Sequence, residues 1–175
     1  MTHLSKRTGL MLDINTAKGR VAAQQQTEAL KIISQHCGTY FVTTSDTDAA
    51  CVDAFAIGED GSIEAVAEIK SRGMTRHQLE QYGDEWLVSF DKIKNGMELA
   101  KMLRVPFIGV LYLVPDGLVM TVVIANKRGD IVVPMRINRT ETQKSINGGL
   151  TVRTNSYINM RSAKCYRAQE YETQN

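Results

Sequence analysis

Two apolar runs joined by a tight turn constrain the fold of this chain most strongly. They form the sequence "CVDAFAIGEDGSIEAVAEIK" (51–70). The central Asp60-Gly61 is a strong signal for a two-residue hairpin turn, because both turn positions require a positive φ. A turn at these residues joins two antiparallel strands and places Asp53 directly opposite Glu68.

The second strand of this hairpin has two different faces. Side chains alternate along a strand, so one face of 63–70 is uniformly apolar and belongs to the core. That face consists of Ile63, Ala65, Ala67 and Ile69. Glu68 and Lys70 lie on the other face, where the hairpin also places Asp53. One face is therefore expected to pack, while the other concentrates charge.

The two paired carboxylates predict a cation site. Carboxylates about 5 Å apart repel by roughly 3 kcal/mol at an effective dielectric constant of 20, so one must be protonated or a cation must lie between them. Oxygen ligands of this kind suit Mg²⁺ or Mn²⁺, which serve phosphoryl chemistry. Lys70 could then hold an attacking water or stabilise charge on phosphorus. The alternative is an ordinary solvated face, which is the usual setting of Glu and Lys on a strand.

The remaining chain alternates between helical and strand patterns. A long helix is predicted from an N-cap at Thr16 to a stop at Gly38. Its apolar face consists of Val21, Ala22, Ala29, Ile32 and Ile33. Thr75 opens a short helix, because "TRHQ" has the Thr-x-x-Gln form of a capping box. A further helix is predicted at 91–104, and further strands at 39–44, 85–90, 106–114, 118–125 and 130–137.

These elements predict an α/β fold with a mixed central sheet flanked by helices. The strand at 85–90, the helix after it and the strand at 106–114 form a candidate right-handed parallel crossover. A loop-rich basic segment follows the last strand. The predicted domain spans 16–168, with a flexible N-terminal segment at 1–15 and a tail at 169–175.

Composition excludes several classes of protein. No apolar run reaches the roughly 18 residues of a membrane span, and no signal peptide is visible, so a cytoplasmic location is expected. Cys37, Cys51 and Cys165 contain no CxxC pair and have few histidines to join them. Neither a disulfide framework nor a zinc site is therefore predicted.

Positive charge is concentrated near the C-terminus. Residues 126–168 hold nine Lys or Arg against two Asp or Glu, although the whole chain has a net charge of only +2. Such a segment can bind a polyanion such as DNA. The candidate phosphate contacts are Lys127, Arg128, Arg136, Arg139, Lys144 and Arg153, the last expected to be presented from the Gly-rich turn of "NGGLTVRTN". A solvated basic face without a partner is the alternative.

An aspartate, a hairpin and a Glu-x-Lys motif, preceded by a helix that carries a glutamate, together resemble the PD-(D/E)xK (restriction-endonuclease-like) nuclease superfamily. The matching residues are Asp53, Glu68-Ile69-Lys70 and Glu28. The sequence "QLEQY" (78–82) is similar to the Gln-x-x-x-Tyr motif of the RecB-type and phage-exonuclease branch. Val52 stands where the motif has proline, and the cysteines of the iron–sulfur cluster found in some RecB-type members are absent.

The resemblance implies a restriction-endonuclease-like domain that hydrolyses DNA with Mg²⁺ or Mn²⁺, in a phage or in recombination and repair. It implies that Asp53, Glu68 and Ile69 hold the metal and that Lys70 assists the attacking water. It further implies that Glu28 and Gln78 have supporting roles in the active site and that Tyr82 contacts DNA.

The outlying residues also have plain structural explanations. Glu28 can be an exposed residue at the edge of its helix face, and Gln78 only the capping partner of Thr75. Tyr82 can be a core aromatic. Lys92 could point toward the same cleft, but a solvated lysine at a helix start is the commoner case.

Two other classes of function stay open at the level of sequence. One is a nuclease-like module or subunit that binds nucleic acid without cleaving it. The other is an α/β interaction domain whose hairpin charges face solvent. Homodimerisation is also left open.

Overall fold

The fold was analysed in a computed structural model, which describes residues 16–44, 50–145 and 148–168. The predicted N-terminal segment 1–15 and tail 169–175 lie outside the described residues. The predicted α/β class is confirmed, because helices flank a mixed six-stranded sheet.

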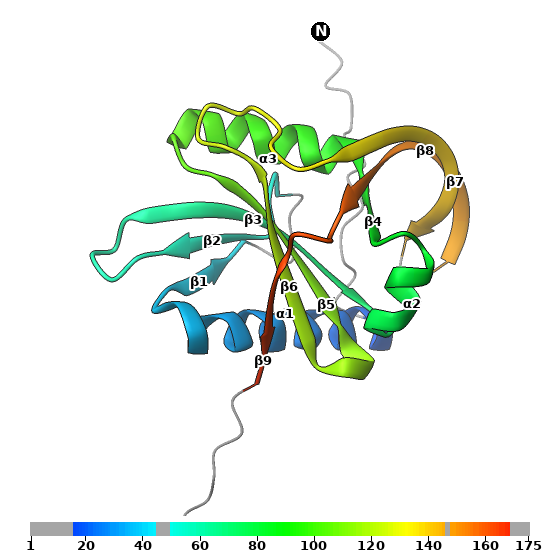
Figure 1. Ribbon diagram of the computed structural model, residues 1–175, viewed down its shortest axis with the longest axis horizontal. Coiled ribbons are helices and arrows are strands. Elements are labelled where there is room, and N and C mark those ends of the chain that lie inside the picture. The colour runs from blue at the N-terminus through cyan, green and yellow to red at the C-terminus, as the bar shows by residue number, and fades with distance from the viewer. Residues whose placement is uncertain (1–15, 45–49, 146–147, 169–175) are drawn as a thin grey trace, which may run out of the picture.

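The six-stranded sheet has the order β1-β2-β3-β5-β6-β9 (Figure 1). Only β3 and β5 pair in parallel, and their neighbours run antiparallel. Its strands are β1 (Tyr40–Thr43), β2 (Ala54–Ile57), β3 (Ile63–Arg72), β5 (Phe107–Leu113), β6 (Leu118–Ala125) and β9 (Lys164–Arg167). A short 3₁₀ turn, η1 (Val114–Asp116), joins β5 to β6.

A second, three-stranded sheet has the order β4-β8-β7. Its strands are β4 (Glu85–Ser89), β7 (Met135–Ser145) and β8 (Gly148–Asn159). The predicted loop-rich basic segment is therefore wrong, because most of it is the β7–β8 hairpin. The strand predicted at 130–137 is wrong in its bounds and in its sheet, since β7 begins at Met135 and only an isolated bridge joins Ile131 to Ala125.

The parallel crossover is also different from the predicted one. β4 pairs with β8 in the second sheet, so it is not the parallel partner of β5. That partner is β3, and the connection between them contains α2 (Arg76–Gln81), β4 and α3 (Phe90–Leu103). The local pattern around β4 cannot reveal this, because its partner lies about 70 residues later in the chain.

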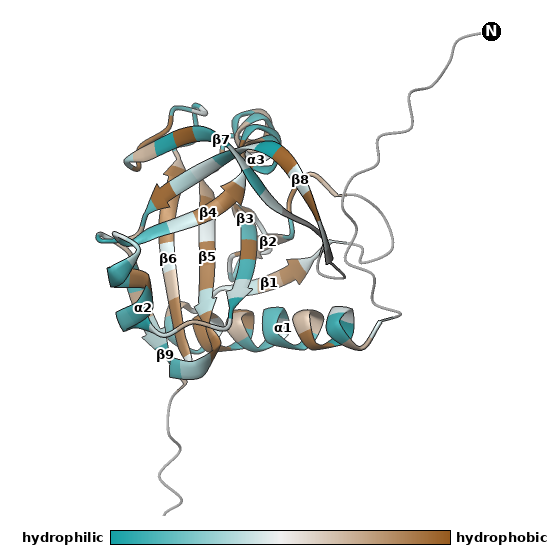
Figure 2. Ribbon diagram, turned by 90° about the vertical axis from the view of Figure 1, so that its right-hand side faces the viewer, coloured by the Kyte–Doolittle hydropathy of each residue, from teal (hydrophilic) through white to brown (hydrophobic). Residues whose placement is uncertain are grey.

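Helix α1 (Ala17–Cys37) covers one face of the six-stranded sheet (Figures 1 and 2). Its predicted ends are confirmed: the Thr16 side chain accepts a hydrogen bond from the Gly19 amide, and Gly38 is left-handed with φ 62°. Its buried apolar residues are Ala29, Leu30, Ile32 and Ile33.

Two residues predicted to lie on apolar core faces are exposed instead. Val21 is 50% exposed and Ile63 is 38% exposed. Both lie in the first part of their elements, before the stretch in which most residues are buried. Periodicity alone therefore misplaces them.

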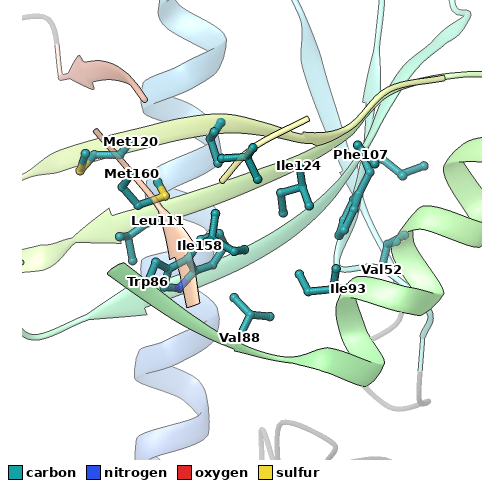
Figure 3. Close-up of a cluster of buried hydrophobic side chains, with 14 of the residues drawn as sticks. Val52, Trp86, Val88, Ile93, Phe107, Leu111, Met120, Ile124, Ile158 and Met160 are labelled. Carbon is teal, nitrogen blue, oxygen red and sulfur yellow. The ribbon is translucent and has the colours of Figure 1, made fainter. Parts of the chain in front are cut away.

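Helix α3 and the second sheet cover the opposite face (Figure 2). The core between them includes Trp86 and Val88 of β4, Ile93 of α3 and Phe107 of β5 (Figure 3). Val52 lies in the same core. Val52 directly precedes Asp53 in the chain, and Ile93 directly follows Lys92. Burial of these two apolar residues therefore helps to fix the positions of their charged neighbours.

Candidate active site

The β2–β3 hairpin keeps the predicted register by a route that the sequence did not predict. The turn is one residue longer than a two-residue turn, since the Gly58 amide donates to the Ser62 carbonyl at 2.9 Å. A bulge next to Ile57 then compensates, so that Ala54 pairs with Ala67. The next positions along the two strands are Asp53 and Glu68, as predicted.

Asp53 lies just before β2 and is bound to the edge of β3 through its side chain. Its Oδ2 accepts a hydrogen bond from the Ile69 amide at 2.8 Å, while its own amide donates to the Ala67 carbonyl at 2.9 Å. The carboxylate therefore takes a place in the hydrogen bonding of the strands, which fixes its position beside Glu68.

Glu68 is fully buried in the middle of β3. Its Oε1 lies 2.8 Å from Nζ of Lys70, and its Oε2 lies 3.5 Å from Nζ of Lys92. Within the described residues, neither oxygen accepts a hydrogen bond of good geometry. A carboxylate held inside the protein by ion pairs alone is costly, which is unusual for a purely structural residue. Because Glu68 is buried, the alternative that it belongs to an ordinary solvated face of the hairpin is wrong.

Three different oxygen groups surround the ammonium of Lys70. Its Nζ lies 2.8 Å from Glu68 Oε1, 3.1 Å from the Ile69 carbonyl oxygen and 3.4 Å from Asp53 Oδ2. These are the oxygen donors that the sequence assigned to a metal. The arrangement therefore already holds one cation, in the form of the lysine ammonium.

Lys92 is a fourth member of the cluster, and the interpretation of a solvated lysine is wrong. It lies in the first turn of α3, and its Nζ is 3.2 Å from Asp53 Oδ1 and 3.5 Å from Glu68 Oε2. β4 runs directly into α3, and Ile93 is buried, so the helix start is held against β3. The position of Lys92 right after an apolar strand was the only signal in the sequence.

The charges of the cluster shift its pKa values in different directions. Burial by itself raises the pKa of Asp53, but Lys70, Lys92 and the Ile69 amide outweigh it and hold this pKa below its usual value. Burial raises the pKa of Glu68, opposed by Lys70 and reinforced by Asp53. For Lys70, burial favours the neutral form, but Glu68 and Asp53 outweigh it and raise the pKa. These ion pairs therefore favour the protonated, cationic form of Lys70.

The oxygen donors fit a hard divalent cation. Mg²⁺ is commonly bound by one or two protein carboxylates and completed by waters and substrate phosphate. Asp53, Glu68 and the Ile69 carbonyl meet this requirement. In the described ranges, no three His, Cys, Asp or Glu side chains gather into a cluster that could hold a metal ion.

The structure does not bring Glu28 into this cluster. Glu28 is exposed on α1 and hydrogen-bonds Tyr112, whose pKa rises to about 12 because of burial and this glutamate. Tyr112 belongs to the core under α1, whereas Val66, which shares a face of β3 with Glu68, belongs to the core under α3. Glu28 and Glu68 therefore lie on opposite faces of the six-stranded sheet.

Gln78 and Tyr82 lie at the two ends of α2. The predicted capping box is confirmed, since Gln78 Oε1 accepts from the Thr75 amide at 2.8 Å and the Thr75 side chain accepts from the Gln78 amide at 3.2 Å. The Gln78 carboxamide oxygen is therefore engaged in helix capping. Tyr82 is 68% exposed, so it is not a core aromatic.

Several basic residues of the 126–168 segment pair with carboxylates. Arg136 forms a bidentate pair with Glu85, with contacts of 2.8 and 2.6 Å, and Arg161 pairs with Asp84 at 3.0 Å. Arg128 pairs with Asp130 at 3.1 Å. Part of the positive charge of this segment is therefore neutralised, in two cases by carboxylates from a distant part of the chain, Asp84 and Glu85.

The other basic candidates are spread over the hairpin and the loop before it. Lys127 and Arg139 are exposed. Arg153 lies within β8, opposite Thr140, so its predicted presentation from a Gly-rich turn is wrong. The side chain of Lys144 lies outside the described residues. The Lys127 loop contacts the end of α3 near Lys101, roughly 14 Å along the helix from Lys92.

Comparison of the chain with known protein families, with characterised proteins and with solved structures found no match. The resemblance to the PD-(D/E)xK nucleases therefore depends on Asp53, Glu68, Lys70 and the order of the elements that carry them. Among the helices in the described part of the chain, none has the length and apolar character to cross a bilayer.

Replacing Lys92 with methionine should destabilise the protein, and more so at higher pH. The change leaves two buried carboxylates with one cation, and we expect a loss of about 1–3 kcal/mol in the free energy of unfolding. Glu68 has a raised folded pKa, so its protonation favours the fold at low pH, and this contribution is lost as the pH rises above 4.5. Removing Lys92 raises this pKa further.

Urea unfolding at about pH 8 and about pH 5 measures both effects through the linkage of stability to protonation. The matched control is Lys94→Met, because Lys94 is exposed on the same helix. Equal losses in the two variants, or a loss that does not grow with pH, would show that Lys92 does not neutralise the carboxylates.

Proposed function

We propose that the protein is a metal-dependent DNA nuclease of the PD-(D/E)xK type. One observation carries the proposal: Asp53, Glu68 and the Ile69 carbonyl turn their oxygens toward a single cation, the Lys70 ammonium. This donor set, held by a hairpin and a buried strand, suits a divalent ion of the kind used in phosphodiester hydrolysis.

The residues of the cluster would divide the work of hydrolysis. Asp53 and Glu68 would hold Mg²⁺ together with the Ile69 carbonyl. A metal bound there supplies Lewis-acid activation of the phosphodiester and of a water. The side chain of Lys70, which is 36% exposed, can swing aside while its charge remains next to the reacting phosphate. As a cation, it would orient the attacking water and stabilise the negative charge that develops on phosphorus.

The setting of the cluster also suits a polyanionic substrate. The β7–β8 hairpin, with its exposed Arg139, packs on the same side of the six-stranded sheet as Glu68 and Lys70. Positive charge on this side of the sheet would offset the repulsion between DNA phosphates and the two carboxylates.

A second candidate function is a nuclease-like module that binds nucleic acid without cleaving it. The observation in its favour is the charge balance of the cluster. Lys70 and Lys92 already neutralise Asp53 and Glu68, so the four side chains form a complete ion-pair group without a metal. This candidate predicts DNA binding that does not require Mg²⁺.

Incubation with linear, circular and branched DNA tests the two candidates. We expect cleavage with Mg²⁺ or Mn²⁺, none with EDTA, and DNA binding without cleavage in Ca²⁺. Calorimetry of Mg²⁺ binding to the free protein is the second measurement. DNA binding with neither cleavage nor measurable Mg²⁺ binding would reject the nuclease and support the binding module.

A further inference from the structure

A small pocket opens beside the candidate active site, between α2, β4 and the β7–β8 hairpin. Its volume is about 260 Å³. Its walls include Arg72, Tyr82, Trp86, Leu111, Arg136 and Tyr157. This volume is below the roughly 300 Å³ at which typical small-molecule sites begin, so it suits one ring system and not a large cofactor.

Arg72 brings a positive charge to the wall of the pocket. Its guanidinium donates to the Ser71 carbonyl at 3.1 Å and to the Leu87 carbonyl at 3.2 Å. It forms no ion pair with any residue in the described ranges. Burial lowers its pKa, opposed by the charge of Glu68. A half-buried guanidinium that has no carboxylate in ion-pair contact is less well compensated than a paired one, and a bound anion would supply that contact.

The second arginine of the pocket is already satisfied. Arg136 is bound by Glu85 through a bidentate pair, and its guanidinium carbon lies 3.8 Å from the ring centre of Tyr157. Among the described residues, the pocket therefore retains one guanidinium without a direct ion pair, that of Arg72, in a site that already accommodates stacking on an aromatic ring.

Aromatic residues form part of the rest of the wall, together with Met74, three leucines and Glu85. Tyr82 is 68% exposed and Trp86 is buried. Within the described residues, the Trp86 indole nitrogen has no hydrogen-bond partner. An exposed aromatic ring, here Tyr82, next to a cation is a feature with which proteins bind the bases and phosphates of single strands.

The pocket continues the charged face of β3. Side chains alternate, so Arg72 is on the same face as Lys70 and about 7 Å further along the strand. Leu111, which lines the pocket, is the register partner of Lys70 on β5. A strand of DNA whose phosphate lies at Lys70 would therefore place a neighbouring nucleotide at Arg72.

We propose that this pocket binds one nucleotide of a DNA single strand, next to the phosphate held at the candidate active site. Its phosphate pairs with Arg72, and its base packs against the aromatic wall near Tyr82. The position relative to the cleaved bond rests on the proposed nuclease function. Nucleotide binding itself requires no metal.

The only tryptophan in the chain, Trp86, lies in this wall and supplies a direct probe. Thymidine 5′-monophosphate, thymidine and a thymidine octanucleotide are titrated in EDTA, followed by tryptophan fluorescence and by calorimetry. We expect the monophosphate to bind at least roughly tenfold more tightly than thymidine, because of the charge-assisted contact with Arg72. The octanucleotide should bind more tightly still.

Paired variants test the two parts of the pocket. Arg72→Gln should remove the preference for the monophosphate over thymidine, whereas Arg20→Gln, on the opposite face of the sheet, should keep it. Tyr82→Ala should weaken both ligands, whereas Tyr40→Ala should not, although Tyr40 is also 53% exposed. If Arg72→Gln does not fold, Arg72→Lys and Tyr82→Ala still test whether the pocket binds the nucleotide, because Tyr82 is largely outside the core.

Three results would overturn the proposal. The first is that the monophosphate does not bind. The second is that Arg72→Gln and Arg20→Gln have equal effects on binding. The third is that the monophosphate binds but the octanucleotide does not, which would indicate a site for free nucleotides. Because the titrations contain no metal, nucleotide binding in a protein that does not cleave DNA would reject the nuclease and retain the pocket. Cleavage without nucleotide binding would do the reverse.

Discussion

Replacing Lys70 with methionine is expected to reduce Mg²⁺-dependent DNA cleavage by about 10²–10³-fold, as when a donor to the transition-state charge is lost. Methionine keeps most of the length of the side chain and removes the cation that lies among the three oxygen groups. Single-turnover cleavage of labelled DNA measures the chemical step without contributions from product release.

The same variant is expected to bind Mg²⁺ at least as tightly as the wild type. In the wild type, the Lys70 ammonium lies where Asp53 and Glu68 would hold the metal, so the two cations repel and compete. Calorimetry should therefore show equal or higher Mg²⁺ affinity together with lost cleavage. Lys94→Met is the control for removal of a lysine charge. Undiminished cleavage by Lys70→Met would assign the activity to another site or to a contaminant.

Replacing Asp53 with asparagine is expected to abolish metal binding and to lower the free energy of unfolding by about 2–4 kcal/mol. The amide oxygen can still accept the hydrogen bond from Ile69, so the variant removes mainly the negative charge. Lys70 and Lys92 are then left with Glu68 as their only carboxylate in the cluster. Calorimetry of Mg²⁺ binding and urea unfolding measure the two effects.

The stability difference should depend on pH in one direction. Asp53 has a folded pKa below its usual 3.8, so its contribution is complete above that pH and is lost as the pH falls through the lower folded value. The gap between wild type and variant should therefore shrink in acid.

Glu28→Gln is the matched carboxylate-to-amide control, because Glu28 lies on the opposite face of the sheet. We expect it to keep metal binding and cleavage. Two results would contradict the assignment of Asp53 as a metal ligand paired with the lysines. One is a difference in the free energy of unfolding between wild type and Asp53→Asn that grows in acid. The other is an equal loss of metal binding in Asp53→Asn and Glu28→Gln.

The local sequence determined the ends of helices and the pairing of the first hairpin. Thr16 caps the start of α1 and Gly38 caps its end, while Thr75 and Gln78 form the capping box at the start of α2. These ends were predictable because capping depends on residues within one helical turn. Asp53 and Glu68 meet because the two strands are joined by a short loop, even though a longer turn and a bulge replace the predicted geometry. Their pairing was thus predictable within about 20 residues of chain.

Contacts between distant segments were decided only by the tertiary structure. β4 pairs with β8, and Glu85 forms an ion pair with Arg136, although the partners are far apart in the chain. Packing of α3 on β3 brings Lys92 to the carboxylates, and placement of α1 on the other face takes Glu28 away from them.

The physical reason is that periodicity and capping act over a few residues, whereas the burial of Glu68 and the exposure of Tyr82 depend on what packs above them. A single strand pattern shows which side chains share a face. Only the packed layers decide whether that face meets solvent, a helix or a pocket such as the one that contains Arg72.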